Sequence, residues 1–288
     1  MRRFELLEPR SFDAAVALLA ERPEAKAIAG GTALLILIKH GIYLPEALVN
    51  LRKIPGMADI TFDAASGLRI GALATINDVE RSPLVREHYP LLAEACHVVA
   101  NIRIRNLATV GGNLAHADYQ SDPPGALVAL DARLELQGPD GVREVALSEF
   151  LLGAYETTLV PAELVRAVLL PAHEPGWHGA YLKFTTRSSE DRPAAGVSAL
   201  LRFDGGRCTD ARVVAGAATP VPARLTSVED ALRGAAVDAA AAAGAGRLAE
   251  SSIEPIDDLR GSARYKQRVV GALVERAILQ CAAQGGAA

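Results

Sequence analysis

The chain has 288 residues, of which 50% are hydrophobic. This length is enough for two domains with a sizeable core, and the composition excludes an intrinsically disordered chain. The net charge is −4, and no block rich in Lys and Arg interrupts the sequence. We therefore expect no nucleic-acid-binding role, since neutralising phosphates requires a basic surface.

No stretch of the sequence predicts a membrane span or a secretory signal. The most apolar run, residues 33–38, stops at Lys39 and His40 and is far too short to cross a bilayer. The first five residues are a polar lead into a strand, whereas a secretory signal would place a long apolar stretch after its charged start. We therefore expect a cytoplasmic protein with no transmembrane segment.

The cysteines and histidines do not predict a metal site. Cys96, Cys208 and Cys281 lie far apart without a C-x-x-C motif, and each is expected to be a small, buried or partly buried residue. None of the six histidines belongs to an H-x-x-x-H or similar pair. We therefore expect no zinc ion or iron–sulfur cluster in this chain. No side chain has the surroundings of a nucleophile, so no catalytic residue is assigned.

Residues 1–56 predict a small α/β unit. Ser11 is a good N-cap, and the apolar residues after it have helical spacing until Pro23 ends the pattern. Alternating strands and helices favour a parallel sheet. The expected strands are residues 4–7, 26–29 and 47–50, and the expected helices are residues 12–20 and 34–39.

Residues 57–176 predict a second unit, which contains hairpins. Apolar residues alternate on both sides of the turn at Gly67, which favours two paired strands. Thr75 or Asn77 is expected to cap the first helix. The expected strands are residues 60–62, 68–70, 133–137, 142–145 and 163–170. One helix is expected to end at residue 81, and another is expected at residues 89–99. A polar turn is expected at residues 101–106 and a helix or strand at residues 125–130.

The last part of the chain has a different pattern. Three long strands are expected at residues 177–186, 195–203 and 207–217, and they form an antiparallel meander. Helices are expected at residues 227–233, 235–249 and 262–282, of which the alanine-rich one carries little side-chain information. The change in composition at residues 171–176 predicts a domain boundary there.

The chain is organised around one stretch, Thr109-Val110-Gly111-Gly112-Asn113, with Ser121-Asp122 and two prolines after it. Adjacent glycines let a ligand approach the backbone, and a concave row of N–H groups suits a phosphate. Thr109 and Asn113 could hold a phosphate oxygen or fix the loop, and Asp122 could accept a hydrogen bond from a ribose hydroxyl. By itself, however, a Gly-Gly-Asn sequence is more typical of an ordinary turn.

A similar segment lies upstream, Ala29-Gly30-Gly31-Thr32-Ala33-Leu34. It follows a short apolar strand and opens an apolar helix, an arrangement that binds anions through backbone N–H groups. Its spacing matches neither the dinucleotide motif G-x-G-x-x-G nor the P-loop. Two such segments could hold the two phosphates of one dinucleotide from opposite sides.

Together, the two motifs resemble the FAD-binding segments of the medium, flavin-binding subunits of molybdenum hydroxylases. This family includes aerobic carbon monoxide dehydrogenase and the xanthine dehydrogenase relatives, and the resemblance covers essentially the whole chain. It implies an α+β fold in which residues 1–176 form an FAD-binding domain of the vanillyl-alcohol-oxidase type. That domain would consist of two small α/β subdomains, about residues 1–56 and 57–176. Residues 177–288 would form a C-terminal α+β domain of antiparallel strands with helices.

The resemblance also implies which residues bind FAD. Those of the first segment are Ala29, Gly30, Gly31, Thr32, Ala33 and Leu34. Those of the second stretch are Thr109, Gly111, Gly112, Asn113, His116 and Asp122. Lys183 matches a position that reaches FAD. Leu164 and Val165 match apolar positions that pack on the flavin ring, and Val99 has a similar role.

Several residues near these motifs keep two interpretations. His116 is either a polar loop residue or a contact to the flavin or its phosphates. Lys26 is either a solvated charge, which we favour, or a neighbour of the nucleotide. Residues 187–192 are either a solvated loop or, by the resemblance, a loop that lies close to the isoalloxazine ring and shapes access to it. Asp118 is expected at the surface, because two bare carboxylates beside a phosphate repel each other.

The function that the resemblance implies is electron transfer within an oxidoreductase complex. A large partner with a molybdenum–pterin cofactor would oxidise carbon monoxide, an aldehyde or an N-heterocycle. A small partner would carry two [2Fe–2S] clusters, and FAD in this chain would pass the electrons to an external acceptor. The complex would be a dimer of heterotrimers. The alternatives are a stand-alone FAD-dependent oxidoreductase with its own substrate site, for which no convincing base is present, and a non-enzymatic nucleotide-binding module.

Overall fold

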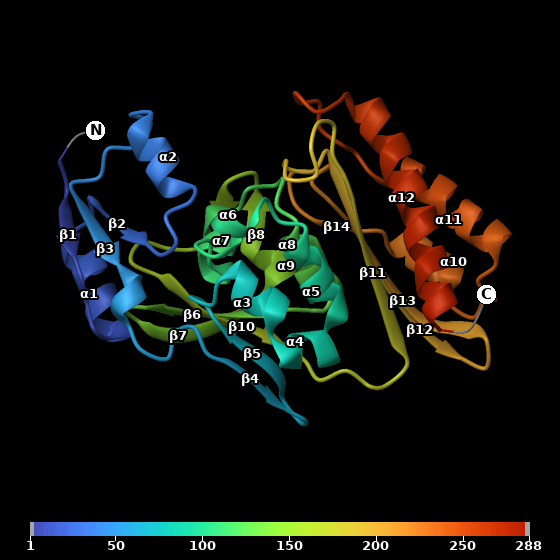
Figure 1. Cartoon of the computed structure of the whole chain (residues 1–288), viewed down its shortest axis with the longest axis horizontal. Helices are drawn as coiled ribbons and strands as arrows, with labels where there is room; N and C mark the ends of the chain where they lie inside the picture. The colour runs from blue at the N-terminus through green and yellow to red at the C-terminus, as the bar shows by residue number, and fades with distance from the viewer. Residues whose placement is uncertain (1–2, 286–288) are drawn as a thin grey trace.

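The computed structural model describes residues 3–285 of the chain. Three units follow one another along the long axis of the molecule, with the N-terminal unit at one end and the C-terminal unit at the other (Figure 1). The mixed α+β fold that the sequence predicts is confirmed. The division into domains at about residue 176 remains our proposal.

The N-terminal unit is built on a parallel three-stranded sheet in the order β1-β3-β2, as expected. The Ser11 side chain caps α1 by accepting a hydrogen bond from the Ala14 amide. Val16 and Val49 are buried between the helix and the sheet. The strands are β1 (Glu5–Leu7), β2 (Ala25–Ile28) and β3 (Ala47–Asn50), and the helices are α1 (Phe12–Glu21), α2 (Leu34–Lys39) and the short 3₁₀ turn η1 (Leu51–Lys53).

The middle unit contains an antiparallel five-stranded sheet in the order β4-β5-β10-β6-β7. Both expected hairpins are confirmed, and β10 lies between them as the central strand. The strands are β4 (Ile60–Asp63), β5 (Gly67–Gly71), β6 (Arg133–Gly138), β7 (Gly141–Ala146) and β10 (Leu164–Leu170), with a small separate pair β8 (Leu151–Gly153) and β9 (Glu156–Thr157).

Short helices cover this sheet. Thr75 caps α3 in a capping box with Asp78, which decides between the two caps that the sequence allowed. The helices are α3 (Ile76–Arg81), α4 (Pro83–His88), α5 (Pro90–His97), α6 (Ile102–Arg105), α7 (Val110–His116), α8 (Pro123–Ala129) and α9 (Leu147–Phe150). The expected polar turn at residues 101–106 is thus a single helical turn, and the element at residues 125–130 is a helix.

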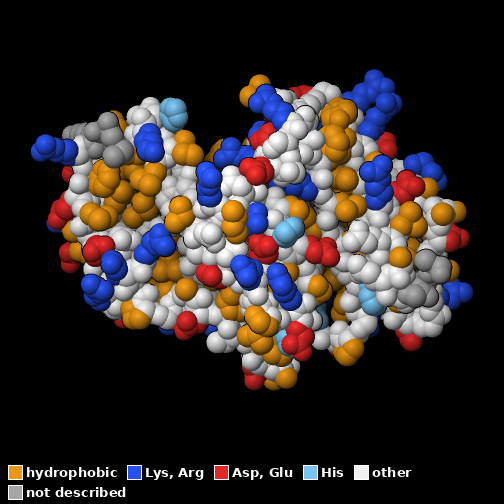
Figure 2. Space-filling view, in the orientation of Figure 1, with side chains coloured by type: hydrophobic (Ala, Val, Ile, Leu, Met, Phe, Trp, Pro, Cys, Tyr) orange, Lys and Arg blue, Asp and Glu red, His pale blue; other side chains and the backbone are white. Residues whose placement is uncertain are grey.

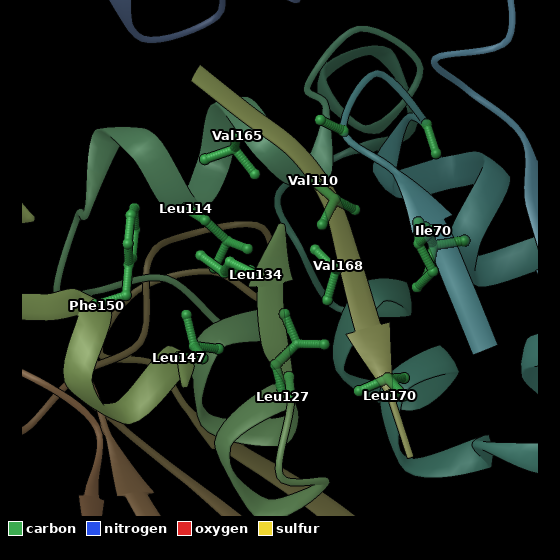
Figure 3. Packing of buried hydrophobic residues seen from close by; sticks show 14 of the residues in the cluster. Ile70, Val110, Leu114, Leu127, Leu134, Leu147, Phe150, Val165, Val168 and Leu170 are labelled. Carbon is green, nitrogen blue, oxygen red and sulfur yellow. The ribbon is translucent and has the colours of Figure 1, made fainter. Parts of the chain in front are cut away.

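The second glycine motif is also helical, which the sequence analysis did not predict. The Thr109 hydroxyl caps α7 by accepting from the Gly112 amide, so the two glycines form the first helical turn. Val110 and Leu114, four residues apart, point from α7 into the core toward Val165 of β10 (Figure 3). This apolar contact offsets the low helix propensity of two adjacent glycines.

The C-terminal unit is an antiparallel sheet with helices on one face. The three expected long strands are confirmed, and a fourth short strand, β14, joins the edge. Helix α11 begins later than expected because Asp238 caps it through the Ala241 amide. The strands are β11 (Trp177–Phe184), β12 (Ala195–Asp204), β13 (Arg207–Gly216) and β14 (Ala223–Arg224), and the helices are α10 (Thr226–Leu232), α11 (Ala239–Ser252) and α12 (Ala263–Gln284).

The two larger units share a buried seam. Helix α12 packs on β11 and β12 from the outside, while α5 and α8 of the middle unit contact β11, β12 and β13 from the other side. Helices of the middle unit therefore meet the C-terminal sheet. No helix among residues 3–285 is long and apolar enough to cross a membrane.

Candidate functional site

The first glycine segment packs against the backbone just before the second. A Cβ atom added to Gly30 would lie 1.9 Å from the carbonyl oxygen of Leu107 and 3.0 Å from the Cα atom of Ala108. A Cβ added to Gly112 would lie 3.8 Å from the Cβ of Ala29. The absence of a side chain at Gly30 therefore lets the N-terminal unit rest on the backbone that leads into α7.

The first segment presents unused backbone donors. The amides of residues 30–33 donate to no backbone carbonyl among residues 3–285, and all four residues are only half-buried. Gly31 has a φ of 71°, a left-handed conformation that glycine adopts without strain. Four successive amides without acceptors in a glycine turn are suited to an anion.

The second segment is different, because its amides are already used within the protein. The Gly111 amide donates to the Ala72 carbonyl at 2.9 Å, and the Gly112 amide donates to Thr109 Oγ1 at 3.2 Å. A Cβ at Gly111 would lie 2.5 Å from the Cβ of Ala72, so this glycine allows α7 to pack closely. Gly112 is exposed and faces the first segment. The row of free amides expected here is therefore present in the first segment instead.

Asn113 is held by a residue that the sequence analysis did not assign. Its side-chain amide donates to Ser121 Oγ at 2.8 Å, and the Ser121 hydroxyl donates back to Asn113 Oδ1 at 3.0 Å. The pair ties α7 to the start of α8. Both residues stand in the motif, but the sequence does not show that they pair.

Asp122 lies in the seam and forms an ion pair with Lys183. Lys183 Nζ is 3.0 Å from Asp122 Oδ2 and 2.8 Å from the carbonyl oxygen of Val98, and Tyr181 donates its hydroxyl to Asp122 Oδ1 at 2.8 Å. Burial raises the pKa of Asp122 to about 6, although its hydrogen bonds to Lys183 and Tyr181 act in the opposite direction. Burial also raises the pKa of Tyr181, so the phenol remains a donor.

Tyr181 was missed in the sequence, although a signal for it was present. It lies two residues before Lys183 on β11, and alternate residues of a strand point to the same face. A lysine assigned to a ligand site therefore indicates the residue two positions away as its neighbour.

His116 lies in a charged environment at the end of α7. Its ring is 5.2 Å from that of Tyr155, measured between centroids. Burial lowers the pKa of His116, Asp118 acts against this, and Arg192 and Lys26 reinforce it. Lys26 of β2 is exposed, and its charge acts on His116 at the end of α7. Asp118 is buried and ion-paired with Arg192, and so it is not at the surface as expected.

The apolar residues assigned to the flavin ring are separated in the structure. Leu164 and Val165 are 8% and 6% exposed and belong to the core beneath α7. Val99 is half-buried at the end of α5, where its carbonyl accepts from Arg105. Val99 thus adjoins the carbonyl of Val98 that holds Lys183.

The charged loop at residues 187–192 is fixed to other parts of the chain. Asn101 donates to Glu190 at 3.2 Å, and Arg260 pairs with Asp191 at 3.3 Å. Arg192 Nε lies 2.9 Å from the carboxylate of Asp118. The loop is therefore anchored beside α6 and the end of α7.

The surface beside these residues is indented. Figure 2 shows an indentation between the N-terminal unit and the rest of the molecule, with Lys and Arg side chains on both sides of it. Helices α2 and α6 lie at this place in Figure 1. Basic side chains around a segment with free amides favour an anionic ligand.

Known proteins match both parts of the chain. Residues 2–173 match the family described as the FAD binding domain in molybdopterin dehydrogenase, and residues 180–281 match the CO dehydrogenase flavoprotein C-terminal domain. The carbon monoxide dehydrogenase medium chain of Hydrogenophaga pseudoflava is 35% identical over 277 residues, which cover 96% of each chain. The nicotine 6-hydroxylase medium subunit of Paenarthrobacter nicotinovorans is 31% identical over 276 residues, again 96% of each chain.

A solved structure extends the match to the fold. Quinoline 2-oxidoreductase from Pseudomonas putida 86 superposes with a TM-score of 0.94 and 32% identity, covering 100% of this chain and 99% of that chain. These matches define a flavoprotein subunit of a molybdenum-containing oxidoreductase complex. The chain belongs to the FAD-binding medium subunits of the molybdenum hydroxylases, the carbon monoxide dehydrogenase and xanthine dehydrogenase family. The resemblance inferred from the glycine motifs is confirmed.

Proposed function

We propose that this chain binds FAD between its two glycine segments and transfers electrons from the [2Fe–2S] clusters of a small subunit to an external acceptor. The single observation that carries the proposal is the row of amides at residues 30–33, which donate to no backbone carbonyl among residues 3–285 and begin where Gly30 contacts the backbone before α7. A large subunit with a molybdenum–pterin cofactor would oxidise the substrate, and two such heterotrimers would associate.

The residues present fit the cofactor. The amides of residues 30–33 would hold the pyrophosphate, and Thr109, Asn113 and the exposed backbone at Gly112 would form the opposite wall. Each charge-assisted amide bond contributes roughly 1.5–3 kcal/mol. Four of them give about 6–12 kcal/mol before ordering costs, so nanomolar binding, which needs about 12 kcal/mol, also requires burial of the ring.

The remaining assigned residues would act on the flavin ring. Lys183 would approach it from the seam, with Val99 beside it, and Leu164 and Val165 of β10 would pack on it. When bound, FAD supplies the exchange of electrons between one-electron and two-electron carriers. The protein positions the ring, excludes water and sets the charge around it.

We infer that the large subunit selects the substrate. Relatives named for carbon monoxide, nicotine and quinoline are 35%, 31% and 32% identical to this chain, so none of these substrates is favoured by similarity. A subunit that only transfers electrons does not contact the substrate, so its sequence need not vary with the substrate of the complex. Expression with candidate large and small subunits, followed by substrate-dependent flavin reduction, tests this assignment.

The first experiment is an absorbance spectrum of the purified chain. Peaks near about 370 and 450 nm, with FAD released by heat alone, are expected for a non-covalent flavoprotein. Gly112→Val should abolish flavin content without unfolding the C-terminal unit, because its Cβ would lie 2.8 Å from the Thr109 hydroxyl that caps α7 and 3.8 Å from Ala29 of the first segment. Full flavin content in this variant would show that the segment does not line the site.

A further inference from the structure

A buried chain of three side chains crosses the seam between the middle and C-terminal units. Asp122 comes from the start of α8, whereas Tyr181 and Lys183 come from β11. The side chains of Lys183 and Asp122 are 7% and 5% exposed. Asp122 occupies the N-cap position of α8 but makes no capping hydrogen bond, because its carboxylate is turned toward β11.

The absence of a side chain at Gly196 makes room for the phenol of Tyr181. Gly196 lies on the neighbouring strand β12, and a Cβ there would be only 2.6 Å from the Tyr181 hydroxyl oxygen. The backbone amide of Tyr181 donates to Glu94 at 3.1 Å, which fixes the strand at this residue. The hydroxyl therefore has one well-defined direction, toward Asp122.

Lys183 retains hydrogen-bonding capacity. Its ammonium has three donors, of which one goes to Asp122 and one to the carbonyl of Val98. Asp122 follows Ser121, which holds Asn113 of the second segment. Continuous contacts thus connect Lys183 with the wall of the FAD site.

We propose that Tyr181 is a positioning residue that acts through Asp122 to hold the ammonium of Lys183 toward the flavin, where it favours the reduced form. The inference rests on the proposed FAD site. Reduction of the flavin by two electrons adds negative charge to the ring, so a fixed cation beside it stabilises the reduced form. Tyr181 occupies Oδ1 of Asp122, so Lys183 pairs with Oδ2 alone and keeps one donor for the flavin.

The molecule offers a matched control. Tyr119 donates its hydroxyl to Asp258 at 3.0 Å, and Asp258 is 2.6 Å from the buried Lys266 Nζ. This second Tyr–Asp–Lys group joins the loop between α7 and α8 to the loop before α12 and to α12 itself, and nothing assigns its three residues to the flavin. Tyr119→Phe removes the same hydroxyl from the same kind of group.

The test is the flavin reduction potential of the FAD-loaded full chain at pH 8, measured against redox dyes. In Lys183→Met, the preference of the protein for reduced over oxidised FAD should fall about tenfold. This lowers the two-electron reduction potential of the flavin by about 30 mV. Tyr181→Phe should lower this preference severalfold in the same direction, and Tyr119→Phe should leave it unchanged. Gly196→Ala, which displaces the phenol, should repeat the effect of Tyr181→Phe and serves if that variant does not fold.

Several outcomes would overturn the proposal. An unchanged potential in folded Tyr181→Phe or Gly196→Ala, beside a shifted one in Lys183→Met, would remove the role of Tyr181. An unchanged potential in Lys183→Met would show that the ammonium does not act on the flavin, while FAD binding itself would stand. A wild-type chain that binds no FAD would refute the proposed function and this inference with it.

Discussion

Replacing Gly30 by alanine adds one methyl group at the point where the two glycine segments touch. The added Cβ would lie 1.9 Å from the Leu107 carbonyl oxygen and 2.7 Å from its carbon. A comfortable contact needs about 3.5 Å, so the segments must separate by roughly 1.5 Å. Gly30 does not have a left-handed φ, so alanine adds no backbone strain of its own. The contact with Leu107 is therefore the perturbation.

The effect on FAD binding should exceed the effect on stability. Overpacking of this kind costs about 1–3 kcal/mol of unfolding free energy. A displacement of roughly 1.5 Å takes an amide out of the range of about 2.7–3.2 Å that a hydrogen bond to phosphate requires. Loss of two such bonds costs about 3–6 kcal/mol, so the Kd for FAD should rise roughly 10²- to 10⁴-fold.

The assay is a titration of the FAD-free chain with FAD, followed by the quenching of flavin fluorescence, with a thermal melt of each variant. Gly244→Ala in α11 is the control, since a Cβ there meets only Arg247 Nη2 at 3.9 Å. It should bind FAD normally and be equally or more stable. A wild-type Kd in folded Gly30→Ala would refute the reasoning, because the contact between the segments would then have no part in binding.

Two further predictions concern charged groups. Asp122→Ala leaves Lys183 buried without its counter-charge, so the unfolding free energy should fall by about 3–5 kcal/mol in urea denaturation; an unchanged midpoint would contradict the ion pair. Burial raises the pKa of Glu80, but hydrogen bonds from His97 and Arg105 outweigh it and leave this pKa below its usual 4.5. Glu80 therefore contributes its full stabilisation above about pH 4.5, and this contribution is lost as the pH falls through the lower pKa of the folded state. Glu80→Gln should reduce the loss of unfolding free energy on acidification, measured by urea denaturation at several pH values.

Local patterns were sufficient for most of the fold. The hairpin around Gly67 and the long strands of the C-terminal unit follow from alternation and turn residues, which act between neighbours in sequence. The parallel N-terminal sheet follows from the order of its elements. The same reasoning misjudged the second glycine motif, because the apolar contacts of Val110 and Leu114 with β10 override the poor helix propensity of Gly111 and Gly112.

The site was predictable as a set of segments but not as a set of contacts. The two glycine motifs are visible in the sequence, whereas the contact of Gly30 with Leu107 depends on how two units pack. Asp122 and Lys183 are 61 residues apart, and nothing local to Asp122 indicates that its carboxylate turns toward β11. Asp118 was misjudged for the same reason, since its partner Arg192 comes from a distant loop.

The two glycine segments, which look alike in sequence, divide the work of the site. Helix α7 is complete without a ligand, because the Gly111 and Gly112 amides have acceptors in the protein and the apolar face is buried. The first segment is incomplete, because the amides of residues 30–33 lack backbone acceptors among residues 3–285, although the carbonyls of Gly31 and Ala33 already accept from the first amides of α2. Unmet donors are costly unless water or a ligand satisfies them. The preformed helix is therefore the platform, and the segment that rests on it is the part that an anion would complete.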